Sequence, residues 1–190
     1  MRKFSRKQDE SYREAASLLA DGMAQDAIDR FREILDEKPN HYSSLIAIGV
    51  ALIQVQETPS ISDPRTEEAF RYLDQAASMD RKNPVPIFNK GVCLRNIGMY
   101  EEALETFDQV LAIEKKNPLA VLHKAEINYE LERWEESLVL AKLALARDPG
   151  LEGSMGWVRN AMKKAGLLDD DGNVIRKVEE EPSEYRSYDV

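Results

Sequence analysis

The sequence predicts an all-α fold, a solenoid of four helix-turn-helix repeats followed by a capping helix. Two observations carry this prediction: similar segments recur at a fixed step, and apolar residues within each segment recur at helical spacing. The composition agrees, because the 190 residues include only 9 Gly and 8 Pro. Ala, Leu, Glu and Lys, which favour helix, are abundant. The length suits one domain with a short appendage.

Four segments align on a small residue that precedes an aliphatic or aromatic residue. These anchors are Ala27, Ala69, Ala103 and Ser137, and the last three follow one another at steps of 34 residues. Another helical segment, with its own small residue, precedes each anchor; these residues are Ala15, Gly49, Gly91 and Ala125. Each repeat is therefore predicted to contain two helices.

The ends of the helices are marked by glycine and proline. Gly22 and Gly98 stand where the first helix of a repeat should stop, because glycine tolerates the left-handed conformation of a helix C-cap. Prolines stand at the ends of the repeats, where a helix can begin but not continue; they are Pro39, Pro84, Pro118 and Pro149. The sequence therefore predicts where each helix pair is interrupted.

Residues 1–151 are predicted to hold the repeats, at about 8–41, 42–83, 84–117 and 118–151. The second repeat is longer, and its extra residues fall in the segment ETPSISDPR, 57–65. Two prolines and several small polar residues predict an exposed loop there. A tolerated surface insertion is the main interpretation, and a loop that contacts a partner is the alternative.

The C-terminal part of the sequence changes character. Residues 152–166 continue the apolar spacing and predict a capping helix, since a stack of repeats must cover its last apolar face. We expect Trp157 to pack within this cap. Residues 167–190 are acidic and polar, so we expect a mobile or loosely docked tail.

Charge and cysteine content exclude several classes of function. The formal net charge is -9, which argues against nucleic acid or an anionic membrane surface as the main partner. The single cysteine, Cys93, excludes an internal disulfide and a thiolate metal site, and we expect it to be buried. The charged N-terminus is unlike a secretory signal, and no stretch is apolar enough for a membrane span. A cytoplasmic location is the default expectation.

The sequence contains no recognisable catalytic or cofactor motif. His41 and His123 are far apart in the predicted stack, and neither belongs to a Ser/His/Asp or metal-ligand pattern. The segment DDDGNVIRKVEE resembles a calcium loop, but it lacks the glycine required at the sixth place, so we expect an Asp-Gly turn. Phosphate-binding and dinucleotide-binding motifs are also missing. We therefore predict no enzymatic activity, no cofactor and no metal.

The repeats resemble the tetratricopeptide repeat family from about Gln8 to Leu151. The resemblance is carried by the small residues on the first helix, an aromatic residue before the second helix, the anchors, an aromatic residue four positions later, and the terminal prolines. The aromatic residues are Tyr100, Trp134, Phe31 and Phe107. The resemblance implies a right-handed α-solenoid whose first helices line a concave groove for a peptide or helix of another protein.

Transferred to this sequence, that geometry implies a set of groove residues. They are Tyr12, with Ala16 and Leu19, in the first repeat; Ile46, Val50 and Ile53 in the second; Phe88, Asn89, Val92 and Arg95 in the third; and Leu122, His123, Glu126 and Tyr129 in the fourth. Because the set is largely apolar, we expect binding through burial of the partner's apolar side chains. Asn89, Arg95 and His123 would add orienting hydrogen bonds.

The resemblance thus implies a protein-interaction module that serves as an adaptor, an assembly factor or a chaperone-like holder. Family members that bind acidic chaperone C-termini use Lys and Asn on the first helices, whereas this sequence has Tyr12 and Ala16 at two of those places. Two alternatives remain open. The groove could be filled by the N-terminal arm or by the tail, through Tyr185 and Tyr188, or it could form a homodimer.

Overall fold

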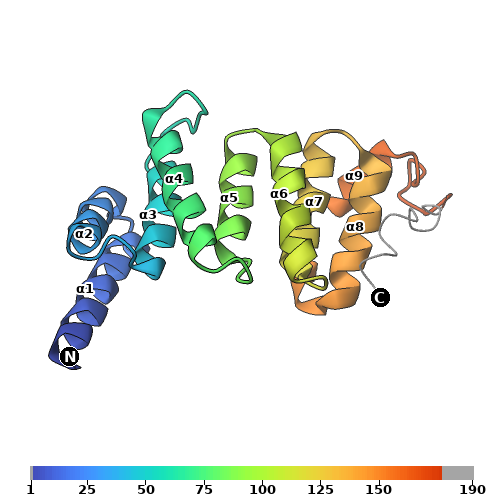
Figure 1. Ribbon diagram of the computed structural model, residues 1–190. Coiled ribbons are helices and arrows are strands. Elements are labelled where there is room, and N and C mark those ends of the chain that lie inside the picture. Colours follow the sequence, from blue (N-terminus) through green and yellow to red (C-terminus); the bar gives the residue numbers. More distant parts are fainter. Residues whose placement is uncertain (1, 177–190) are drawn as a thin grey trace. The chain divides into compact units, whose positions relative to one another are not determined.

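The computed structural model describes residues 2–176, with side chains from Glu10 onward. Over this range the chain is helical, apart from turns and an isolated β-bridge between Leu168 and Val174. The helices are α1 (Arg2–Ala20), α2 (Ala24–Glu37), α3 (Tyr42–Gln54), α4 (Pro64–Met79), α5 (Val85–Asn96), α6 (Tyr100–Ile113), α7 (Pro118–Glu130), α8 (Trp134–Arg147), the 3-10 helix η1 (Pro149–Ser154) and α9 (Val158–Lys164) (Figure 1). The predicted all-α fold of helix-turn-helix repeats is confirmed.

The turns within the repeats use the left-handed backbone conformation. Gly22 and Gly98 follow the ends of α1 and α5, and both have a φ of 80°, as the sequence predicts for a C-cap glycine. The equivalent position after α7, one repeat beyond Gly98, holds Glu132 with a φ of 59°. A side chain in this conformation is strained, since its Cβ crowds the following carbonyl.

Side-chain caps fix the beginnings of three helices. The carboxylate of Asp63 accepts a hydrogen bond from the backbone N–H of Arg65 (2.8 Å) at the start of α4. The side chain of Asn117 accepts from the N–H of Ala120 (2.8 Å) at the start of α7. His41 caps α3 in the same manner through Nδ1. Each cap satisfies an N–H group that has no partner within its helix.

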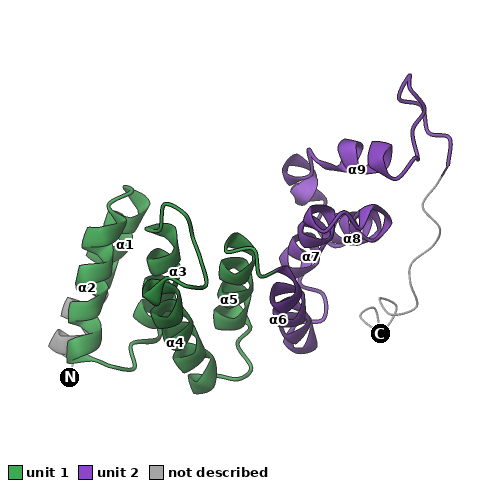
Figure 2. Ribbon diagram, turned by 90° about the horizontal axis from the view of Figure 1, so that it is seen from above, with its two compact units in different colours: residues 1–99 green, residues 100–190 purple. Residues whose placement is uncertain are grey.

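The chain divides into two compact units (Figure 2). Unit 1 comprises residues 1–99 and contains α1 to α5, and unit 2 comprises residues 100–190 and contains α6 to α9. The boundary follows α5, so the two helices of the third predicted repeat belong to different units.

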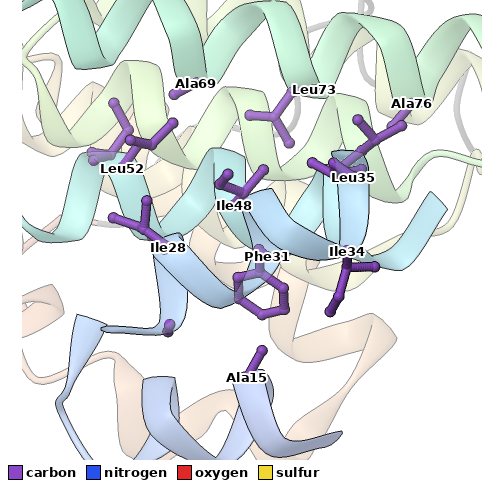
Figure 3. Close-up of a cluster of buried hydrophobic side chains, with 14 of the residues drawn as sticks. Ala15, Ile28, Phe31, Ile34, Leu35, Ile48, Leu52, Ala69, Leu73 and Ala76 are labelled. Atoms are coloured by element: carbon purple, nitrogen blue, oxygen red, sulfur yellow. The ribbon is translucent and has the colours of Figure 1, made fainter. Parts of the chain in front are cut away.

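The core of unit 1 is built where α1, α2, α3 and α4 meet. Figure 3 shows Phe31 of α2 pointing toward Ala15 of α1, and both are fully buried. Leu73 of α4 is also buried and packs against Gly49 of α3. A Cβ at Gly49 would lie 2.7 Å from Cγ of Leu73. The small residue on this first helix therefore permits close packing of α3 and α4.

The insertion between α3 and α4 is held by a polar network. Gln56 is 5% exposed, and its Nε2 donates to the carbonyl of Leu52 and to Oγ1 of Thr66, at 3.0 Å each. The hydroxyl of Thr66 donates to the carbonyl of Ser60 (2.7 Å). These bonds satisfy polar groups that would otherwise be buried without a partner. The outer part of the loop is exposed as predicted, and Ile61 is 54% exposed.

The core of unit 2 lies between α6, α7 and α8. Its fully buried large side chains include Phe107, Leu111, Ile127 and Leu140. Helix α8 also packs against α9, through Leu138 and Ala161.

The cap differs from its prediction in length and position. A helix at 152–166 was expected, whereas the segment forms η1, a short turn, and the seven-residue helix α9. Gly150, Gly153 and Gly156 account for the difference, since glycine disfavours a continuous helix. The acidic tail was expected from residue 167, but Leu167 is 1% exposed and packs in the cap. Residues 177–190, which include Tyr185 and Tyr188, lie outside the described residues.

Candidate peptide-binding surface

The predicted groove residues of unit 1 come from three first helices, α1, α3 and α5. Helix α3 contacts both α1 and α5, so these residues lie on neighbouring elements. The half-buried ones are Tyr12, Ile46, Val50, Phe88, Asn89, Val92 and Arg95, and the neighbouring Ala16 and Leu19 are also half-buried. We call the set Tyr12, Ile46, Val50, Phe88 and Val92 the first-helix surface.

Ile53 does not belong to this surface. It is 2% exposed and packs in the core of unit 1. Helix α3 has apolar residues around most of its circumference and contacts α1, α2, α4 and α5. Helical spacing alone does not distinguish an inward from an outward position on such a helix.

Tyr12 is held in place by two rings. Its ring centroid lies 5.9 Å from that of Phe31 and 5.7 Å from that of His41. Tilted aromatic pairs at such distances are favourable. They join α1 to the second helix of its own repeat and to the start of α3. Tyr12 therefore has a fixed position at one end of the first-helix surface.

Asn89 and Arg95 accompany the apolar residues of α5. The Nδ2 of Asn89 donates to the carbonyl of Val85 within the helix (2.9 Å), which orients its amide. Arg95 lies in the last turn of α5, where a positive charge interacts favourably with the helix dipole.

The predicted groove residues of unit 2 have more varied environments. Leu122 is 4% exposed and is therefore a core residue. His123 stacks on Phe107, with ring centroids 5.2 Å apart, and its Nδ1 lies 2.9 Å from a carboxylate oxygen of Glu126. The phenylalanine ring thus fixes the face of the imidazole, and the carboxylate fixes its Nδ1 edge.

Tyr129 links α7 to the cap. Its ring lies 5.3 Å from that of Trp134 and 5.1 Å from that of Trp157, and its hydroxyl receives a 2.6 Å hydrogen bond from Nδ2 of Asn160. Trp157 therefore packs in the cap, as predicted. These contacts assign Tyr129 a structural role in unit 2.

Two ionic contacts between successive repeats were not predicted from the sequence. Asp74 of α4 binds Lys90 of α5 at 2.7 Å, and Asp108 of α6 binds Lys124 of α7. Both the acidic and the basic residue recur at the repeat period. This shared period of opposite charges was the signal in the sequence that could have revealed the contacts.

Groups that could support chemistry are few in the part of the chain that the structure describes. Within residues 10–176, no three His, Cys, Asp or Glu side chains are grouped so as to hold a metal ion. Cys93 is buried as predicted, and burial raises the pKa of its thiol to about 12. Asp169 accepts hydrogen bonds from the backbone and side chain of Asn173 (2.7 and 3.0 Å), which lower the pKa of its carboxyl. This segment is therefore a hydrogen-bonded turn.

Comparison with known proteins relates this geometry to a family. Residues 98–153 match the tetratricopeptide repeat family. The crystal structure of TTC0263, a thermophilic TPR protein of Thermus thermophilus, matches 82% of this chain and 81% of that chain, with a TM-score of 0.70 and 19% sequence identity. Residues 98–153 are thus of the tetratricopeptide repeat type, and the chain has the fold of tetratricopeptide repeat proteins.

Other tetratricopeptide-type folds match this protein at similar levels. MamA matches 84% of this chain and 83% of its own length, with a TM-score of 0.64 and 13% identity. YrrB, described as a TPR protein with an unusual peptide-binding site, matches 83% of this chain and 73% of its own length, with a TM-score of 0.60 and 20% identity. At these identities the likeness is one of fold. No curated protein matches the sequence.

The tetratricopeptide repeat fold indicates a protein–protein interaction module, and proteins of this type are generally non-catalytic scaffolds. Among the described helices, none combines the length and the apolar character needed to cross a membrane.

Proposed function

We propose that this protein binds an apolar peptide or helix of another protein on the first-helix surface of unit 1. Its role would be that of an adaptor, an assembly factor or a chaperone-like holder. The observation that carries the proposal is the pairing of Ile46 and Val50 on α3 with Phe88 and Val92 on α5. Within each pair the two residues lie one helical turn apart, and all four side chains are half-buried. The two helices are in contact.

The physical basis is the burial of apolar area by side chains that are already ordered. Residues four positions apart lie on one face of a helix, so the two pairs offer the partner two short apolar rows. Because the surrounding helices are packed, few side chains of this protein lose freedom on binding. Asn89 and Arg95 beside the rows would supply orienting hydrogen bonds, as such sites require.

Site-specific crosslinking tests the proposal. A photoreactive benzoylphenylalanine replaces Val50 in one variant and Met79, which is 43% exposed on α4, in a matched control. After irradiation in cells, adducts are isolated and the attached peptides are sequenced by mass spectrometry. We expect the Val50 variant to form adducts with an apolar segment of another protein, and the Met79 variant not to form them.

A double substitution provides the complementary test. Ile46→Glu/Val50→Glu places two carboxylates on the surface, whereas Ile61→Glu/Met79→Glu makes the same change at exposed positions of unit 1. Because the first double substitution changes position 50, the benzoylphenylalanine now replaces Phe88 in both variants. Adduct formation at position 88 should be lost only in Ile46→Glu/Val50→Glu. Adducts with a second copy of this protein would favour the homodimer. Equal amounts of adduct in the two double variants would refute the first-helix surface as the binding site.

A further inference from the structure

A second apolar site lies at the C-terminal end of unit 2. Helices α8 and α9 and residues 167–176 line an open cavity of about 410 Å³, a size typical of ligand pockets. Of its lining residues, Leu138 and Leu167 are buried, while Leu145, Val158 and Met162 are half-buried. We call this cavity the α8–α9 pocket.

The repeat register shows how this pocket differs from the preceding repeat. One repeat before Lys142, the equivalent position on α6 is Asp108, and one repeat before Val158 the equivalent position on α7 is Lys124. Asp108 and Lys124 form an ion pair that joins α6 to α7. On α8 and α9 the same two positions hold Lys142 and Val158, which both line the pocket. The acidic position has become basic, and its basic partner has become apolar.

Lys142 therefore places a positive charge beside an apolar cavity. In the preceding repeat the equivalent residue forms an ion pair with the next helix, whereas the partner position of Lys142 holds the uncharged Val158. Among residues 10–176 its ammonium forms no ion pair. The other cation lining the pocket, Arg176, binds Glu135 of α8 and the carbonyl of Ala165. A ligand carboxylate would therefore find Lys142 available and Arg176 already engaged.

We propose that the α8–α9 pocket binds an acidic amphipathic segment of a partner protein. Apolar side chains of the segment enter between Leu145, Val158 and Met162, and a carboxylate of the segment binds Nζ of Lys142. The charge selects the ligand: a basic segment is repelled, and a neutral one loses the ionic contact. This site is separate from the first-helix surface, since its lining residues come from other elements.

A pair of synthetic peptides tests the proposal with the full-length protein. One is an amphipathic peptide of Leu and Glu in helical register, and its twin has Gln at each Glu. Binding is measured by fluorescence polarisation, and methyl NMR signals of Leu145, Val158 and Met162 report the location. We expect the Glu peptide to bind roughly tenfold more tightly than its twin and to shift these methyl signals.

Two variants separate the specific contact from general electrostatics. Lys142→Glu should weaken binding of the Glu peptide roughly tenfold or more, whereas Lys164→Glu, an equal charge change at an exposed position of α9, should change it less than about threefold. Equal weakening by both variants would overturn the proposal. So would equal affinity for the two peptides, or no binding by either up to roughly 1 mM.

Other occupants give distinct results. The chain's own residues 177–190 include Glu179, Glu180 and Glu181, so the triple change to Gln should strengthen peptide binding if that segment fills the pocket. A second copy of the chain as occupant would give a dimer in sedimentation that Leu145→Glu dissociates. Either result would overturn the proposal, because it would show that the pocket is occupied by this chain and not by a segment of a partner protein. Because the first-helix surface is in unit 1, Ile46→Glu/Val50→Glu should leave unchanged the shifts that the Glu peptide causes in the methyl signals of Leu145, Val158 and Met162.

Discussion

Lys124 of α7 and Asp108 of α6 form an ion pair in which the lysine side chain is 6% exposed and the aspartate side chain is 45% exposed. The equivalent pair in the preceding repeat, Asp74 with Lys90, is more open to solvent. The same contact therefore occurs in two environments within one chain. We expect burial to decide how much each ion pair contributes to stability.

We expect Asp108→Asn to lower the free energy of unfolding by about 1–3 kcal/mol, because it removes a carboxylate charge that pairs with a buried ammonium. Asp74→Asn is the matched control and should cost less than about 1 kcal/mol, as exposed ion pairs do. Urea unfolding followed by circular dichroism measures both values. Equal losses would show that burial of Lys124 does not govern the contact.

Gly49→Ala tests the close approach of α3 and α4. The added Cβ would lie 2.7 Å from Cγ of Leu73 and 3.1 Å from the carbonyl oxygen of Ala69. Since such overpacking must displace a helix or a side chain, we expect a loss of about 1–3 kcal/mol in the free energy of unfolding. Gly153→Ala, where a Cβ meets nothing within 4 Å, should be close to neutral. Thermal melts of the two variants make the comparison.

Glu132→Gly should stabilise the protein. Glu132 has a φ of 59° at the place where Gly98 ends α5 in the preceding repeat, and glycine relieves this strain at some entropic cost. We expect a net gain of about 0.5 kcal/mol in the free energy of unfolding, measured by urea denaturation. Glu130→Gly, within α7, should instead be destabilising. A loss of stability for Glu132→Gly would show that the side chain makes a contact worth more than the strain.

Leu167→Ala tests the extent of the cap. Leu167 is 1% exposed, whereas Ile175 is 65% exposed. Truncating the buried side chain should lower the free energy of unfolding by about 2–4 kcal/mol, while Ile175→Ala should change it by less than about 0.5 kcal/mol. Chemical denaturation of both variants measures the difference. Similar, small effects would place Leu167 in the tail after all.

Cys93 should resist thiol reagents in the folded protein. Its thiol has a pKa of about 12, raised by burial from an ordinary value of 9.0. At pH 8 the thiolate fraction is therefore about a thousandfold lower than in the unfolded chain. Labelling with Ellman's reagent should be slow in buffer and fast in urea. Fast labelling in buffer would show that the thiol is accessible.

The same pKa gives a pH dependence of stability. As the pH rises above about 9, the unfolded chain loses the thiol proton while the folded chain retains it, so stability declines until the pH reaches about 12. Cys93→Ala should remove this component of the decline. Urea midpoints measured between pH 8 and 10.5 for the two proteins test the expectation, and parallel curves would contradict it.

Local features of the fold were predictable because they depend on short stretches of sequence. The constant repeat period, the helical spacing of apolar residues and the C-cap glycines Gly22 and Gly98 each need only neighbouring residues to be recognised. The predicted capping helix failed for an equally local reason, since the spaced glycines between Pro149 and Trp157 interrupt it. The glycine content of that segment already disfavoured a continuous helix.

The sequence by itself determined the repeat, the all-α class and the resemblance to tetratricopeptide repeats, since helix formation and helix ends are governed by residues near in sequence. Tertiary structure decided which residues face outward. Ile53 and Leu122 are apolar residues on helices that contact several neighbours, and only the packing shows that they are buried. It also decided that Lys142 lies beside an apolar pocket, because that depends on how α9 and residues 167–176 cover α8.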